Sequence, residues 1–316
     1  MIKIPVAVTG DEWCNQQQVL SLIAECAPGQ DLVLEVNTEG PSLKAIGFLD
    51  AVIPALAQAG IDIKNVYIDR WHNAVETVPF QRLRKPGLSH FFWMSDSYRH
   101  QTPDPMPLSY VFGLFVGRLT TERVAILHDV FAHLPEAVLF SVMRDSALSR
   151  HFRDEFLDWG SATLAGTVET WISSQPFVSI TDHAVRDQYR EGVNTNADIV
   201  RHYNRFAIEL VCETYCKGQA FFPTEKTVRP ISQSKPMLVY GPKMFLQNIR
   251  NLGFRTWESI WDESYDVLEG PARWGAMRSV LIKIQDQRLW QHPDLDDIAK
   301  HNLLTLEHII NRHRPL

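Results

Sequence analysis

Short apolar runs alternate with stretches of helical spacing over the first third of the chain, and this alternation restricts the fold more than any other feature. Ile4 to Val8 and Asp31 to Asn37 are apolar runs that end in turn residues, as buried strands do. Residues 16–26 carry apolar side chains at helical spacing, and residues 42–59 repeat that pattern up to Gly60. Strands that alternate with helices imply a parallel sheet covered by helices.

A proline-rich segment interrupts the alternation and divides the chain. Residues 102–107 (TPDPMP) hold three prolines, which neither a helix nor a central strand accepts easily. After it the alternation restarts, with a strand expected over 110–116 and a helix over 120–134. At 316 residues the chain is also longer than one hydrophobic core usually becomes. We therefore expect two α/β domains, residues 1–107 and 108–316.

Composition and charge narrow the class of protein. The chain is 45% hydrophobic and 22% charged, as packed globular proteins are. It has neither the apolar core of a signal peptide nor a run approaching the ~20 apolar residues of a membrane span, so we expect a cytoplasmic protein without a membrane span. The net charge of −6 argues against coating of nucleic acid, which requires a basic face. A local groove lined by Arg82, Arg84, Lys85 and Arg99 would be the exception.

The segment with the most chemistry follows an apolar run over 206–214. Thr224, Glu225 and Lys226 stand there at an expected helix start. Such a start offers free backbone N–H groups and the positive end of the helix dipole, both of which stabilise a diphosphate. Lys226 adds a compact positive charge, and Glu225 can accept hydrogen bonds from a ribose diol. The same residues also fit an ordinary helix cap with a surface lysine.

The stretch from Ile208 to Gly241 resembles the donor-binding segment of fucosyltransferase-like enzymes, in which a strand ends in an acidic residue and a Thr-Glu-Lys helix start follows. Residues 252–257 (LGFRTW) and 261–266 (WDESYD) are similar to the continuation in a group of often phage-encoded glycosyltransferase-like proteins. The resemblance covers roughly residues 203–266, about a fifth of the chain. It departs from the fucosyltransferases at Glu213-Thr214, where they commonly carry Glu-Asn, so the sugar nucleotide need not be the same.

The resemblance implies a GT-B architecture, with two Rossmann-like domains facing across a cleft. The C-terminal domain would hold a nucleoside-diphosphate sugar as co-substrate, and the N-terminal domain would hold the acceptor. The last helix would pack back on the N-terminal domain. Ligands in such sheets sit beyond the carboxyl ends of the strands. By the same resemblance Glu225 would bind the ribose and Lys226 the diphosphate, with Glu213, Thr224 and Thr227 beside them.

Other expected strand ends carry residues suited to the reaction. Arg118 follows the strand over 110–116 and would balance the charge that grows on the leaving diphosphate, with Arg123 as second choice. In an inverting reaction the acceptor hydroxyl loses a proton to a base, whereas a retaining enzyme need not have one. Each candidate base also fits a turn or a cap. The candidates are Asp11 or Glu12, Asp69 with His72, and Asp96, with Asp11 preferred because it directly follows the first strand.

Neither the acidic nor the sulfur-containing residues form a metal motif. Asp262, Glu263 and Asp266 cluster in sequence, which fits a divalent ion or, more simply, a salt-bridged helix start. The four cysteines lack the spacing of a zinc site. We therefore expect no metal. Trp13, Trp71 and Trp93 fall near the strand ends of the first domain, where they fit stacking on a sugar and, more simply, packing.

Three functions are compatible with these patterns. The leading one is a metal-independent glycosyltransferase that moves a hexosyl or pentosyl group from a nucleoside-diphosphate sugar to an acceptor hydroxyl, for example of a glycan. The second is a DNA-modifying glycosyltransferase that acts on a hydroxymethylated base, against which the acidic net charge counts. The third is a non-catalytic protein that binds nucleotide sugars or carbohydrates.

Overall fold

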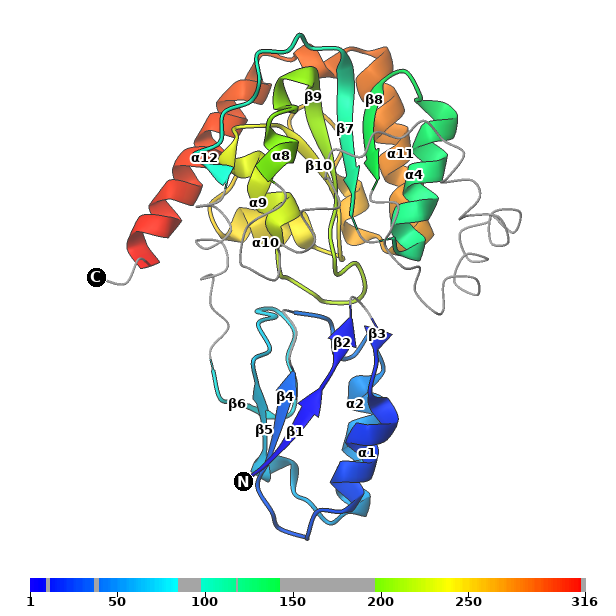
Figure 1. Ribbon diagram of the computed structural model, residues 1–316, viewed down its shortest axis with the longest axis vertical. Coiled ribbons are helices and arrows are strands. Elements are labelled where there is room, and N and C mark those ends of the chain that lie inside the picture. Colours follow the sequence, from blue (N-terminus) through cyan, green and yellow to red (C-terminus); the bar gives the residue numbers. More distant parts are fainter. Residues whose placement is uncertain (10–11, 37–39, 85–97, 118, 143–196, 314–316) are drawn as a thin grey trace. The chain divides into compact units, whose positions relative to one another are not determined.

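The computed structural model describes residues 1–9, 12–36, 40–84, 98–117, 119–142 and 197–313 (Figure 1). The chain forms two compact units that are each built on a parallel sheet, so the α/β class is confirmed. The division differs from the expected one at residue 107/108, because unit 1 also takes two segments from the C-terminal half. Unit 1 consists of Met1–His90, Glu213–Pro223 and Gly241–Asn248, and unit 2 consists of Phe91–Cys212, Thr224–Tyr240 and Ile249–Leu316.

Unit 1 holds a four-stranded sheet in the order β1-β4-β5-β6, in which each neighbouring pair is parallel. The inner strand β4 reads LVLEV and is buried along most of its length, as expected for a strand covered on both faces. Helices α1 and α2 contact each other. The elements are β1 (Ile2–Val6), β2 (Val8–Thr9), β3 (Glu12–Trp13), α1 (Gln16–Ala24), β4 (Leu32–Val36), α2 (Phe48–Gln58), η1 (Ile63–Asn65), β5 (Val66–Asp69) and β6 (Gln81–Arg82).

The loop before α2 explains why this helix is shorter than expected. We expected a helix over 42–59, but α2 begins at Phe48, directly after Gly47 in the left-handed conformation with φ 71°. The Glu76 carboxylate binds the residues before it, accepting from Ser42 Oγ at 2.7 Å, Leu43 N at 2.8 Å and Lys44 N at 3.1 Å. These backbone N–H groups are therefore satisfied by a side chain instead of by helical bonds.

Unit 2 holds a four-stranded parallel sheet in the order β10-β9-β7-β8. Most expected strands and helices of this region are present. The strands are β7 (Tyr110–Val116), β8 (Val138–Val142), β9 (Phe206–Cys212) and β10 (Met237–Tyr240). The helices are α4 (Thr121–His133), α8 (Ala197–Val200), α9 (Glu225–Ser232), α10 (Phe245–Asn251, at the boundary of the units), α11 (Gly270–Asp286) and α12 (Asp294–His313), with short 3-10 turns η2 (Tyr203–Arg205), η3 (Ser264–Val267) and η4 (Leu289–Gln291).

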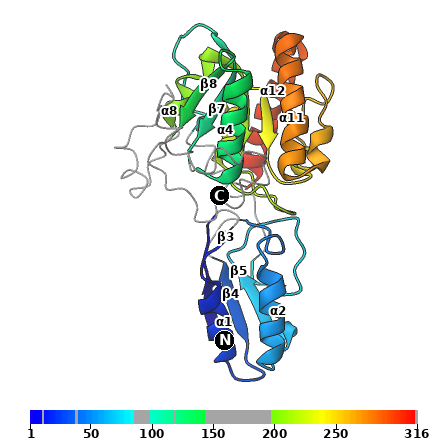
Figure 2. The same cartoon turned by 90° about the vertical axis from the view of Figure 1, so that its right-hand side faces the viewer.

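The strand order of unit 2 reverses between β7 and β9. From β7 the chain moves through α4 to β8 on one side, and from β9 it moves through α9 to β10 on the other. Right-handed crossovers, which are nearly universal, place α4 and α9 on opposite faces of the sheet. Helix α4 contacts α11, which Figure 2 shows next to it, and α9 contacts α12. The sheet is thus covered by helices on both faces.

Three details of the C-terminal half complete the fold. Pro230 lies inside α9, which continues to Ser232. Residues 254–257 form no strand. In α12, Leu306 and Ile310 are buried, whereas Leu304 is 64% exposed. Among the described residues, no helix combines the length and the apolar character that crossing a bilayer requires.

Candidate functional site

The carboxyl ends of β7 and β9 are the place in unit 2 where a ligand is expected. Open α/β sheets bind ligands beyond the carboxyl ends of their strands, at the point where the strand order reverses. Helix α4 follows β7, and α9 follows β9. The N-termini of both helices therefore face the carboxyl edge of the sheet, and both helix dipoles direct their positive ends there.

The start of α9 holds the residues that the sequence singles out. Thr224 is the N-cap, as expected, and its Oγ1 accepts a hydrogen bond from Lys226 N at 3.4 Å. Lys226 Nζ donates to Thr224 Oγ1 at 3.4 Å and to Glu225 Oε1. The side chains of Glu225 and Lys226 remain 21% and 15% exposed, whereas Thr227 and the rest of the helix are buried. The structure thus brings Thr224, Glu225 and Lys226 together and places Thr227 in the core.

The Glu225–Lys226 pair fixes the charge of the carboxylate. Burial, the largest influence, would raise the pKa of Glu225, but the Lys226 ammonium, its hydrogen bond and the backbone N–H of Glu225 itself outweigh burial and lower the pKa to about 2. The Arg229 guanidinium, on the next turn of the helix, acts in the same direction. Glu225 is therefore a hydrogen-bond acceptor, not an acid, at neutral pH.

A buried polar cluster lies behind this helix start and was missed by sequence reasoning. Arg229 of α9 donates to Glu209 of β9 and, through Nε at 2.9 Å, to the hydroxyl of Tyr203, which also bonds to Glu209. None of the three residues is more than 2% exposed. The one available signal was Glu209 itself, because a charged residue inside an apolar strand requires a buried partner. The cluster fixes the position of α9 on β9.

At the start of α4, Arg123 spans the point where the strand order reverses. Thr120 is the N-cap of α4. Arg123 is only 3% exposed, and its Nη2 donates to Cys212 O at 3.1 Å, at the last residue of β9. Arg123 therefore ties α4 to β9, and this contact gives it a structural role. Arg118, the preferred arginine, lies outside the described residues.

Glu213, the acidic residue after β9, is buried within unit 1. It is 2% exposed, and its Oε2 accepts from Thr214 N at 3.2 Å. Its carbonyl accepts from Cys216 Sγ at 3.3 Å. Although it follows β9 directly in the chain, it belongs with residues up to Pro223 to unit 1. The structure therefore does not group Glu213 with Thr224, Glu225 and Lys226 in one unit.

Of the expected bases in unit 1, Asp69 and His72 fall within the described residues and lie at the end of β5. Arg84 Nε lies 2.9 Å from Asp69 Oδ1, and the Asp69 side chain is 7% exposed. Burial and, second, Arg84 lower the pKa of His72, while Asp69 opposes them. The imidazole is therefore largely neutral at pH 7. Glu12 lies in β3, whereas Asp11 and Asp96 lie outside the described residues.

The aromatic and basic residues near these strand ends are structural. Trp13 packs on Phe48 with ring centroids 4.7 Å apart, and Trp71 Nε1 donates to Pro41 O at 3.0 Å. Both tryptophans are buried. The Arg82 guanidinium stacks 4.1 Å from the centroid of the Trp71 ring and donates to three backbone carbonyls of the same loop. Packing, the simpler interpretation, therefore holds for Trp13 and Trp71, while Trp93 and Lys85 lie outside the described residues.

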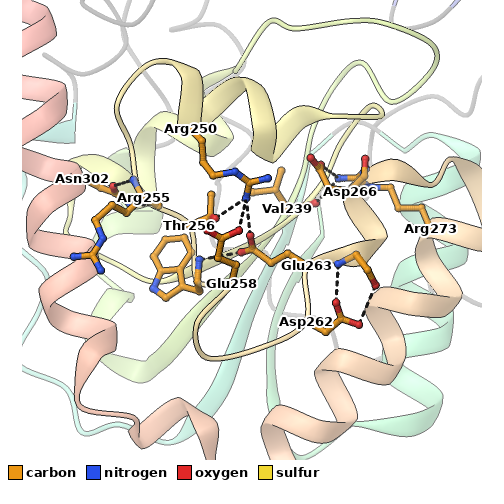
Figure 3. Close-up of polar contacts among 12 residues, drawn as sticks. Val239, Arg250, Arg255, Thr256, Glu258, Asp262, Glu263, Asp266, Arg273 and Asn302 are labelled. Carbon is orange, nitrogen blue, oxygen red and sulfur yellow. Dashed lines mark hydrogen bonds and ion pairs between the residues drawn. The ribbon is translucent and has the colours of Figure 1, made fainter.

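Two of the three residues of the acidic cluster are paired with arginines (Figure 3). The Glu263 carboxylate accepts from Arg250 Nη1 at 3.1 Å and from Trp257 N at 2.9 Å. Asp266 accepts from Arg273 Nη2 at 3.1 Å, while the exposed Asp262 accepts from Ser264 N at 2.8 Å. Burial raises the pKa of Glu263 to about 7. Within the described ranges no group of three metal-ligating residues occurs. These contacts support the salt-bridged interpretation.

The chain matches no protein-family model, no curated protein and no solved structure. The function therefore has to be argued from the residues and their geometry.

Proposed function

We propose that this protein is a glycosyltransferase of the two-domain GT-B type, with two Rossmann-like domains, which moves a hexosyl or pentosyl group from a nucleoside-diphosphate sugar to an acceptor hydroxyl. The observation that carries the proposal is the start of α9. There a capped helix N-terminus at the carboxyl edge of a parallel sheet presents a partly exposed lysine and a carboxylate that is charged at neutral pH. The sequence resemblance to fucosyltransferase-like enzymes covers the same residues.

In this proposal the donor nucleotide binds at the first turn of α9. Lys226 and the positive end of the α9 dipole bind the diphosphate, whose negative charge grows as the bond to the sugar breaks. Glu225 accepts hydrogen bonds from the ribose hydroxyls, which suits a carboxylate with a pKa of about 2. The Lys226 ammonium bonds to Glu225, so a diphosphate has to compete with that carboxylate for it.

On the acceptor side we propose His72 as the base, assisted by Asp69, with Asp11 and Asp96 as the alternatives expected from the sequence. A neutral imidazole can accept the proton of the acceptor hydroxyl, and the lowered pKa of His72 favours that form. Asp69 is better suited to supporting charge than to taking the proton, because it is paired with Arg84. The case for a DNA acceptor is weakened, because Arg82, one of the residues expected to line a basic groove, donates to carbonyls of the loop between β5 and β6.

Titration of UDP and GDP into the wild-type chain and into Lys226→Ala tests the donor site. Loss of a charge-assisted hydrogen bond to phosphate costs about 1.5–3 kcal/mol, so we expect Kd to rise roughly 10- to 100-fold. Lys283→Ala, which removes an exposed lysine from α11, is the matched control and leaves Kd unchanged. Equal binding by wild type and Lys226→Ala refutes the site. Transfer or hydrolysis of a bound nucleotide sugar then separates an enzyme from a non-catalytic binder.

A further inference from the structure

The segment Glu213–Pro223, which we call the strap, is built into unit 1 although both of its neighbours belong to unit 2. It joins the end of β9 to the start of α9. In most α/β units such a connection is a short free loop. The strap instead has a buried polar anchor and buried apolar anchors within unit 1.

The polar anchor is Asn73, which lies after β5 and is fully buried. Its Nδ2 donates to Gln219 O at 2.8 Å, and its Oδ1 accepts from Phe221 N at 3.3 Å. One side chain thus satisfies a backbone acceptor and a backbone donor of the strap. Asn73 also accepts from the N–H groups of Val75 and Glu76, so it is itself held in place. Removing it would leave buried backbone groups without partners.

The apolar anchors leave no free space between the strap and the loop before α2. Gly218 has φ 61°, and a Cβ added to it would lie 2.5 Å from Ser42 Oγ and 2.8 Å from Ala45 Cβ. A Cβ added to Gly40 would lie 2.7 Å from Phe222 Cβ. Tyr215, Ala220 and Phe222 form a buried cluster of their own. The glycines allow a close backbone approach that no other residue permits.

The strap ends where α9 begins. Pro223 is bonded to Thr224, and the carbonyl of Thr224 accepts from Thr227 N and Val228 N at 3.1 Å each, while its hydroxyl accepts from Lys226 N. An N-cap works only with its backbone outside the helical region, and Thr224 has φ −91° and ψ −176°. Whatever fixes Pro223 therefore also restricts the conformation with which Thr224 caps α9.

We propose that Asn73 and Gly218 are positioning residues for the start of α9. By holding the strap they hold Thr224 in its capping conformation, although they belong to the other unit. The further consequence, that strap order raises the affinity for a nucleoside diphosphate, rests on the proposed function. Because linkage is reciprocal, a nucleotide bound at α9 would in turn protect the amides of the strap from exchange.

Hydrogen–deuterium exchange on the full chain tests this directly. We expect Gly218→Ala to raise exchange of the strap and, by about five- to tenfold, of the amides of Lys226, Thr227 and Val228, which is the effect of losing an N-cap. The first turn of α4, capped by Thr120, should not change. The matched control is Gly29→Ala in unit 1, since Gly29 has a similar φ of 76° but a Cβ there meets nothing within 4 Å.

Faster exchange in the strap with unchanged exchange at the start of α9 overturns the inference. An equal rise of exchange in the first turn of α4 also overturns it, because that would indicate general unfolding. If Gly218→Ala does not fold, Asn73→Asp decides in its place, because it is isosteric and replaces the donor to Gln219 O and Pro41 O by a carboxylate oxygen. A parallel titration with UDP and GDP keeps the two proposals apart. Failure of the wild type to bind either nucleotide refutes the donor site, whereas the exchange result at α9 still decides the role of the strap.

Discussion

Two loops of this chain, one in each unit, lead into a helix, and they differ in how they place a carboxylate. Before α2, the N–H groups of Leu43 and Lys44 bind the buried carboxylate of Glu76. At the start of α9, Lys226 N donates to the Thr224 hydroxyl, and the side chains of Glu225 and Lys226 stay partly exposed. The loop before α2 thus uses a buried carboxylate for folding, whereas the start of α9 keeps its charged pair partly exposed.

The largest expected effect concerns how α9 is held. Arg229→Met leaves the Glu209 carboxylate buried without its partner, which should lower the free energy of unfolding by about 3–5 kcal/mol. Arg229→Met combined with Glu209→Leu should recover most of this loss, because an apolar pair needs no solvation. Denaturant unfolding of the single and double variants measures both. A double variant as unstable as the single one would show that packing, not the ion pair, holds α9 on β9.

The next effect concerns the loop before α2, which binds the Glu76 carboxylate. Glu76→Ala leaves the Ser42 hydroxyl and two backbone N–H groups without their acceptor, so we expect a loss of about 2–3 kcal/mol in the free energy of unfolding. Asp50→Ala, an exposed acidic residue in the first turn of α2, is the control and should cost less than about 1 kcal/mol. A small effect of Glu76→Ala would mean that the loop is not organised by its internal anion.

A smaller effect concerns the charged pair at the start of α9. Glu225→Gln removes the negative charge that pairs with the Lys226 ammonium, so we expect inorganic pyrophosphate to bind about fivefold more tightly. The same change removes a charged acceptor for ribose, so UDP or GDP should gain less than pyrophosphate or bind more weakly. Isothermal titration of pyrophosphate and of UDP or GDP into wild type and Glu225→Gln gives the change in Kd for each ligand. Equal changes for the two ligands would remove the ribose-binding role of Glu225.

The sequence predicted the regular elements well because their signals are local. The caps at Thr120 and Thr224, the parallel strands and the left-handed Gly60 all follow from neighbouring residues. What it could not predict depends on partners far apart in the chain. Asn73 meets the strap, and Glu76 meets Ser42, through contacts that no local pattern announces. Glu209 carried a signal that sequence reasoning missed, since its charge in an apolar strand requires a partner.

The smallest expected effect is the pH dependence that Glu225 contributes at the start of α9. The pKa of Glu225 in the folded chain is lowered from its ordinary value of 4.5 to about 2, so its ionised form contributes stability above pH 4.5 that is lost as the pH falls towards 2. Because the side chain is 21% exposed, solvent screening should limit this contribution to about 1 kcal/mol. Wild type should therefore exceed Glu225→Gln in free energy of unfolding at pH 6, and the difference should vanish near pH 2.

The control is Glu307→Gln, which changes an exposed residue of α12 and should show no such convergence with wild type. A constant difference across that range would mean that Lys226 does not stabilise the charge of Glu225.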